Sequence, residues 1–170
     1  MNVRLLLPLI IMFVVAILAA LVLSLIVKVS DRAKPMISNS SKKWHFFIIL
    51  SGVIMILSWL FNFGWLRVVL TWIPIPLIHL IAFVIINAKV ANLIGVSDRF
   101  KRFLPISCLT FLLAYLLFPD VGDVGGGYAF FTLIRNDVIV GIFQCVSLVL
   151  FGTNVIILFV EFMELRRFRS

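Results

Sequence analysis

His79 is the one ionisable side chain, apart from two cysteines, that the sequence places deep inside a long apolar segment. It stands ten residues, or ~15 Å of helical rise, before Lys89. An imidazole changes its charge near neutral pH, so a histidine at such a depth is a candidate proton carrier or pore-lining group. The other interpretation is a packing role, in which the ring bonds to a serine or a carbonyl group of a neighbouring helix.

Two prolines shortly before His79 predict an irregular helix. Pro74 and Pro76 cannot donate backbone hydrogen bonds, so two carbonyl groups of the preceding turn lose their helical partners and the helix should bend. Freed carbonyl groups near water or another helix form binding sites in transporters. We therefore treat the two prolines and His79 as candidates for a pathway or a polar core. Further candidates of this kind are Gln144, Ser58 and Asn62.

A glycine-rich segment, 119–137, carries a different candidate site. Asp120 and Asp123 stand in a turn in which glycines let the backbone approach a partner closely. Their carboxylates could converge on a cation together with loop carbonyl groups, although two carboxylates fall short of a full site. The alternatives are a solvated loop and a surface that recognises an extracytoplasmic partner.

Catalysis is not expected from these residues. The sequence has neither a His-Glu-x-x-His nor a Cys-x-x-Cys motif, and its acidic residues stand singly or in the glycine-rich segment. We therefore assign no catalytic residue, no metal site and no cofactor. Cys108 and Cys145 are expected to lie ~9 Å apart along the membrane normal, too far for an easy disulfide, and we interpret both as packing residues.

The composition excludes a water-soluble domain. Of the 170 residues, 64% are hydrophobic and 13% are charged, whereas soluble domains have about 45–50% apolar and about 25% charged residues. Five stretches approach the ~20 residues that a helix needs to cross a hydrocarbon core of ~30 Å. We therefore predict an all-α integral membrane protein, a bundle of about five transmembrane helices in one polytopic domain, 1–170. The predicted spans are 5–27, 44–63, 68–88, 103–118 and 138–160.

Charge placement predicts the orientation. Twelve of the fifteen lysines and arginines fall in the first loop, the third loop and the C-terminal tail, which five crossings place on one side. Because such cations are retained in the cytoplasm, we expect the N-terminus outside and the C-terminus inside. Glu161 and Glu164 are counted with the cytoplasmic acids. We call the main group of these cations the basic rim: Arg32, Lys34, Lys42, Lys43, Arg99, Lys101, Arg102, Arg166, Arg167 and Arg169.

The basic rim has two interpretations. Its cations set the topology and bind anionic lipid headgroups of the bilayer, or they dock an acidic cytoplasmic protein. Nucleic acid is not expected, because aromatic residues are not interleaved with the cations.

Small and polar residues recur on one face of several predicted spans, and such faces associate helices in lipid. The second span has such a face at Ser51 and Met55, and the fourth has one at Ser107 and Thr110. Five helices offer more of these faces than one small bundle buries, so we expect a homo-oligomer. The packing residues assigned to the first and fifth spans are Ala16, Ala20, Gly141 and Gly152.

These observations favour a non-enzymatic, oligomeric inner-membrane subunit of a bacterial cell. It would anchor or regulate a cytoplasmic partner through the basic rim and sense membrane or extracytoplasmic events, for example in a phage-defence or toxin-immunity module. The alternative is a small ion channel or transporter with His79, Pro74 and Pro76 at the pathway. An intramembrane enzyme is the third and weakest interpretation.

Overall fold

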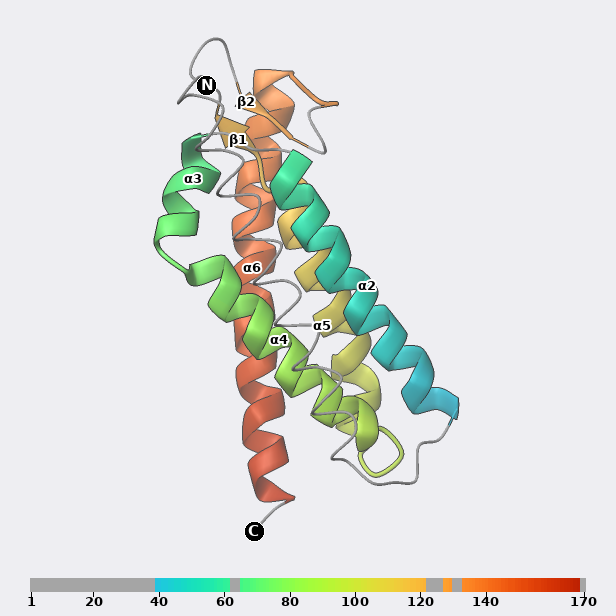
Figure 1. The fold of residues 1–170 in the computed structure, drawn as a ribbon. Coiled ribbons are helices and arrows are strands. Elements are labelled where there is room, and N and C mark those ends of the chain that lie inside the picture. Colours follow the sequence, from blue (N-terminus) through green and yellow to red (C-terminus); the bar gives the residue numbers. More distant parts are fainter. Residues whose placement is uncertain (1–38, 62–64, 122–126, 130–132, 169–170) are drawn as a thin grey trace, which may run out of the picture. The chain divides into compact units, whose positions relative to one another are not determined.

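The computed structural model describes residues 39–61, 65–121, 127–129 and 133–168, all within one compact unit, Pro35–Ser170. The described chain is helical apart from one short hairpin (Figure 1). The predicted first span, 5–27, lies outside the described residues. The elements are α2 (Asn39–Phe61), α3 (Trp65–Trp72), α4 (Ile75–Asn92), α5 (Asp98–Leu117), β1 (Asp120–Val121), β2 (Gly127–Tyr128) and α6 (Asp137–Arg167).

Within the described residues, four helices are long and apolar enough to cross a membrane, which confirms the predicted class of an α-helical membrane bundle. Two helices extend beyond the predicted spans. α5 begins at Asp98, five residues before 103, and α6 continues to Arg167, seven residues beyond 160. Charged residues lower the hydropathy of these ends, but lysine, arginine and glutamate are good helix formers, so the helices extend beyond their apolar parts.

The predicted third span, 68–88, is two helices rather than one bent helix. α3 ends at Trp72, and α4 begins at Ile75 and continues to Asn92. Pro74 is the residue that caps α4, and Pro76 occupies its first turn, where no intrahelical donor is needed. The prolines therefore start a new helix, which is a stronger effect than the predicted bend.

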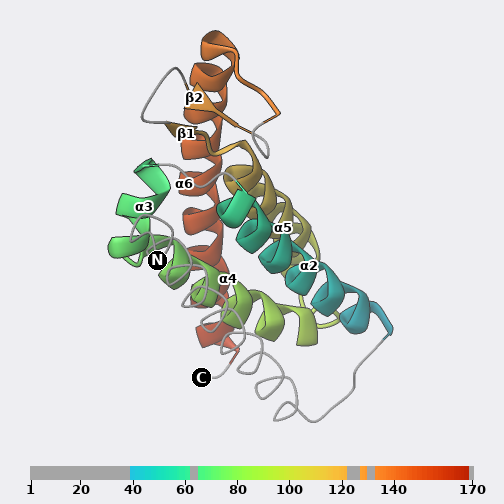
Figure 2. The same cartoon turned by 45° about the horizontal axis from the view of Figure 1, so that its top comes forward.

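The four long helices alternate in direction, with α6 running the length of the bundle and α4 crossing it (Figure 1). α6 packs most extensively against α5, while α2 packs against both α4 and α5. A second view shows α2 and α5 side by side and α4 crossing below them (Figure 2). The aromatic core lies between α4 and α5, where the Phe83 and Phe111 rings stack with centroids 3.8 Å apart and neither side chain is exposed.

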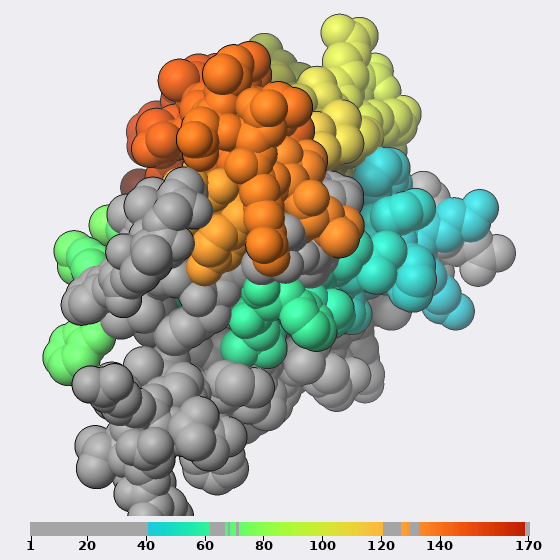
Figure 3. Space-filling model, turned by 90° about the horizontal axis from the view of Figure 1, so that it is seen from above, coloured from blue at the N-terminus to red at the C-terminus, as the bar shows by residue number. Residues whose placement is uncertain are grey.

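The hairpin closes one end of the bundle. β1 and β2 are antiparallel, with Asp120 opposite Tyr128, and the hairpin lies against the start of α6. A Cβ atom on Gly127 would come within 2.8 Å of Val140 Cγ1, so this close approach requires glycine. Asn136 caps α6 by accepting hydrogen bonds from the backbone of Val138 and Ile139. Figure 3 looks down on this end, where the hairpin and the start of α6 are drawn in shades of orange.

Candidate functional site

α6 carries a buried polar side chain at every seventh residue along its middle and last turns. Ser147, Asn154 and Glu161 are all fully buried. Seven residues make nearly two helical turns, so the three side chains lie on one face of the helix. The sequence did not predict Asn154 as a site residue, and it predicted Glu161 as a cytoplasmic charge. The signal that could have identified both is this seven-residue spacing of polar residues in an apolar helix.

His79 lies at the centre of a buried hydrogen-bonded cluster built by three helices. Its Nε2 is 2.8 Å from Asn154 Oδ1 on α6, and its Nδ1 is 2.9 Å from the Tyr115 hydroxyl on α5. Asn154 Nδ2 donates to the carbonyl oxygen of Ser107 at 2.7 Å and to Thr110 Oγ1 at 3.0 Å. We call these five residues the His79 cluster. None of the five side chains is more than 7% exposed.

The carbonyl group of Ser107 determines how protons are arranged in the cluster. A carbonyl oxygen only accepts hydrogen bonds, so the amide nitrogen of Asn154 must face it and the amide oxygen must face His79. His79 Nε2 therefore donates to Asn154 Oδ1. In the neutral ring Nδ1 then has a free lone pair, which accepts the hydrogen bond from the Tyr115 hydroxyl.

The cluster lies near the middle of the bundle and is enclosed by aromatic rings. Asn154 is 17 residues after Asp137 and 13 before Arg167, the two ends of α6. The Phe151 ring contacts the His79 ring edge-on with centroids 4.5 Å apart. Water has little access to such a site, so each polar group needs a partner from the protein itself.

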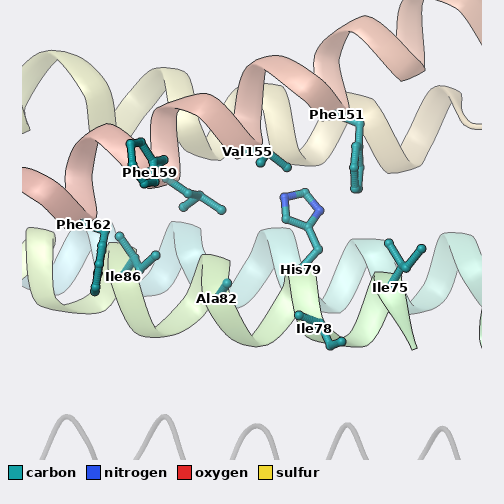
Figure 4. A pocket seen from close by; sticks show the side chains of 10 residues that line it. Ile75, Ile78, His79, Ala82, Ile86, Phe151, Val155, Phe159 and Phe162 are labelled. Carbon is teal, nitrogen blue, oxygen red and sulfur yellow. The ribbon is translucent and has the colours of Figure 1, made fainter. Parts of the chain in front are cut away.

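An apolar cavity of about 390 Å³ adjoins His79 between α4 and α6. Ile75 and Ala82 line it from α4, and Val155 and Phe159 line it from α6. The imidazole points from α4 toward α6 at the edge of this cavity (Figure 4). Among the described residues that line it, His79 is the only one with an ionisable side chain.

A buried ion pair lies at the hairpin end. Arg67 on α3 and Asp120 on β1 approach to 3.7 Å, and neither side chain is exposed. Arg67 also donates to the carbonyl groups of Ser58 and Phe118, and it lies over the Trp59 ring. Burial lowers the pKa of Arg67 from its ordinary value to about 10, an effect that Asp120 partly opposes. The guanidinium therefore stays charged at neutral pH.

This ion pair involves one of the two aspartates of the predicted cation loop. Asp120 is buried and pairs with Arg67. Asp123 lies outside the described residues. Ser58, predicted as part of a polar core, is fully buried and donates a hydrogen bond to the carbonyl group of Tyr115 at 2.9 Å. Asn62 also lies outside the described residues.

The described members of the basic rim are exposed at the ends of α2, α5 and α6. Ser41 of α2 donates to Asn92 of α4, and Arg99 of α5 pairs with Glu164 of α6 at 3.2 Å, so these ends meet at one end of the bundle. Arg32, Lys34 and Arg169 lie outside the described residues. The exposed members are Lys42, Lys43, Arg99, Lys101, Arg102, Arg166 and Arg167.

The predicted packing faces have mixed outcomes. Ser51 and Met55 on α2 are buried, and so are Ser107 and Thr110 on α5. Burial of these residues confirms that both predicted faces pack inside the bundle. The predicted face of α6 points away from the described bundle, because the face of Asn154 is the one that α4 and α5 cover. Gly141, Gln144 and Cys145 on that face are exposed, Gly152 is half-buried, Cys108 is buried, and Ala16 and Ala20 lie outside the described residues.

Comparison with known proteins identifies no family. The chain matches no protein-family model, no curated protein and no solved structure. The described helices define the class of a helical bundle with segments able to cross a membrane.

Opposite tautomers are expected for the two histidines when both are neutral. His79 should carry its proton on Nε2, whereas His45 should carry it on Nδ1, which lies 2.8 Å from the carbonyl oxygen of Ser41. Solid-state NMR of protein labelled with ¹⁵N-histidine in lipid bilayers measures this difference. His45→Gln assigns the two signals. Asn154→Leu should disturb the His79 signal alone, and a neutral His79 with its proton on Nδ1 would contradict the cluster.

Removing one partner of the buried ion pair should strongly destabilise the bundle. Arg67→Met leaves the Asp120 carboxylate buried without its cation, a change that typically costs about 3–5 kcal/mol in the free energy of unfolding. Adding Asp120→Leu should recover part of this loss. Reversible unfolding in mixed micelles measures both variants. Lys101→Ala, which removes an exposed ion pair, is the matched control and should change little; equal losses in both single variants would refute this account.

Proposed function

We propose that this protein is a small proton-carrying membrane protein, a channel or a proton-coupled transporter, with His79 as its mid-membrane proton site. The observation that carries the proposal is the position of the His79 ring between the Tyr115 hydroxyl and the Asn154 amide inside the bundle. Ionisable residues inside membrane bundles are costly and mark ion pathways and proton relays. The alternative function drawn from the sequence is thus the one that the geometry favours.

The hydrogen bonds around His79 give the ring a way to pass a proton. Tyr115 stands two residues before the end of α5 at the hairpin end, whereas Ser107 and Asn154 lie toward the middle of the bundle. A proton that water on the Tyr115 side delivers to Nδ1 makes the ring cationic. The proton on Nε2 can then leave to water on the Asn154 side, because the Asn154 amide is too weak a base to take it. Each such transfer moves one charge through the middle of the bundle, and rotation of the neutral ring or a second proton exchange restores the starting tautomer.

The break between α3 and α4 supports the same proposal. His79 lies in the second turn of α4, which begins next to this break at Ile75. Discontinuous helices of this kind surround the binding sites of many transporters. In this proposal the chain spans the inner membrane of a bacterium five times, with the hairpin end outside and the basic rim in the cytoplasm.

Proteoliposomes test the proton pathway directly. Under a potassium diffusion potential, wild-type protein should acidify the lumen faster than protein-free vesicles do, and His79→Gln should reduce the rate to that of empty vesicles. His45→Gln makes the same change near the start of α2 and should keep the wild-type rate. Undiminished proton flux through His79→Gln, in protein that elutes as the wild type does, would exclude His79 as the proton site.

A second candidate function is the membrane anchor of an acidic cytoplasmic protein. The exposure of basic rim residues from three helix ends at one end of the bundle favours it. At this end Glu164 and Asp98 already pair with cations, and the remaining charges face outward. The exposed face of α6 at Gly141 and Gln144 would serve self-association of such a subunit.

Loss of a bound partner tests the anchor. A single stoichiometric soluble protein should co-purify with the wild type and be lost when Arg99, Lys101 and Arg102 are changed together to glutamine, because these cations supply the electrostatic attraction. The same triple variant should leave proton flux unchanged. Retention of the partner by the triple variant would rule out docking at these residues.

A further inference from the structure

Glu161 is a fully buried carboxyl group in the part of α6 between the His79 cluster and the basic rim. Neither of its oxygens has a hydrogen-bond partner among the described residues. No lysine, arginine or histidine nitrogen of the described chain lies within ion-pair distance of it. By contrast Glu164, three residues later, pairs with both Arg99 and Arg167.

The register of α6 places Glu161 on the face that carries the His79 cluster. It follows Asn154 by seven residues, about 10 Å along the axis, and it precedes Arg167 by six residues, about 9 Å. Glu161 therefore lies roughly midway between the buried histidine and the charged end of the helix. No other acidic residue in the described part of α6 occupies this face and is buried.

The described groups on the neighbouring helices form no ion pair with Glu161. On α5 the buried Cys108 thiol interacts electrostatically with the carboxyl group. On α4, Ile86 lines the same cavity as Phe162, the residue after Glu161, and Ile86 is followed by the buried Asn87. Asn87 Oδ1 also lacks a hydrogen-bond partner among the described residues. The cation of α4 nearest to this level is the half-buried Lys89.

We propose that Glu161 is a protonated carboxyl group and the cytoplasmic-side proton-binding site that follows His79 in the pathway. An unpaired carboxylate is poorly solvated in such surroundings, so the group is held neutral by a bound proton. A neutral carboxyl group can donate that proton to water that enters from the end of the bundle with the basic rim. It can then take up another proton from the side of Asn154. The inference rests on the proposed proton-carrying function and adds a second proton site to it.

Modification by dicyclohexylcarbodiimide tests the protonation of Glu161 without any transport assay. This reagent enters bilayers and adds a protonated carboxyl group across one C=N bond: the carboxyl proton goes to nitrogen, and the carboxylate oxygen bonds to the central carbon. The O-acylisourea then rearranges by acyl transfer from oxygen to nitrogen, giving a stable N-acylurea with no leaving group. Mass spectrometry of full-length protein in liposomes at neutral pH should find one reagent mass on Glu161 and none on Glu164. An unmodified Glu161, or equal modification of both residues, would overturn the proposal.

The proton-flux assay tests the role of Glu161 in the pathway. Glu161→Gln keeps the size of the side chain and resembles its neutral form, so the variant should fold but have the flux of empty vesicles, whereas Glu164→Gln should conduct as the wild type does. Wild-type flux through Glu161→Gln would overturn the proposal and leave His79 as the proton site. A wild-type protein that carries no protons would overturn the proposed function, and this outcome is distinguishable because Glu161 modification is measured separately.

Discussion

The hydrogen bond between His79 and Asn154 is the contact on which the packing of this bundle depends. In an apolar interior a polar group gains partners only from other parts of the protein, and an unpaired group is costly. Asn154 meets this requirement by joining α6 to Ser107 and Thr110 on α5 and to His79 on α4. Any rotation of one of the three helices would leave several of these groups without a partner. The cluster therefore determines which face of each helix turns inward.

Ion pairs are buried at one end of the bundle and partly exposed at the other. At the hairpin end Arg67 and Asp120 are paired out of contact with water, and the guanidinium also bonds to backbone carbonyl groups. At the other end the ion pairs of Arg99 and Lys101 are partly exposed. Exposed pairs contribute little to stability, whereas a buried pair is costly to break because each partner leaves an uncompensated charge. Breaking the pair at the hairpin end is therefore costly, whereas the ion pairs at the opposite end are partly exposed and contribute little.

Polar groups recur at successive depths between these two ends. Ser147, Asn154 and Glu161 mark three depths on one face of α6, and His79 joins the middle one. Glu161 differs from the others because its oxygens have no partner among the described residues. A structural role would be met better by an apolar residue at this position, since a buried polar group without a hydrogen-bond partner is costly. This contrast is the physical reason to regard Glu161 as a site of proton exchange.

The sequence by itself determined the class of the protein, because apolar length and scarcity of charge are properties of each segment alone. It also identified His79, a helix irregularity at Pro74 and the buried faces of α2 and α5. It could not select between the two polar stripes of α6, one through Gly141 and Gln144 and one through Ser147 and Asn154. Only the tertiary structure decided this, because the choice depends on Ser107, Thr110 and His79, which lie far away along the chain. The pairing of Asp120 with Arg67 and the burial of Glu161 were decided for the same reason, since partners and solvent access are set by packing between helices.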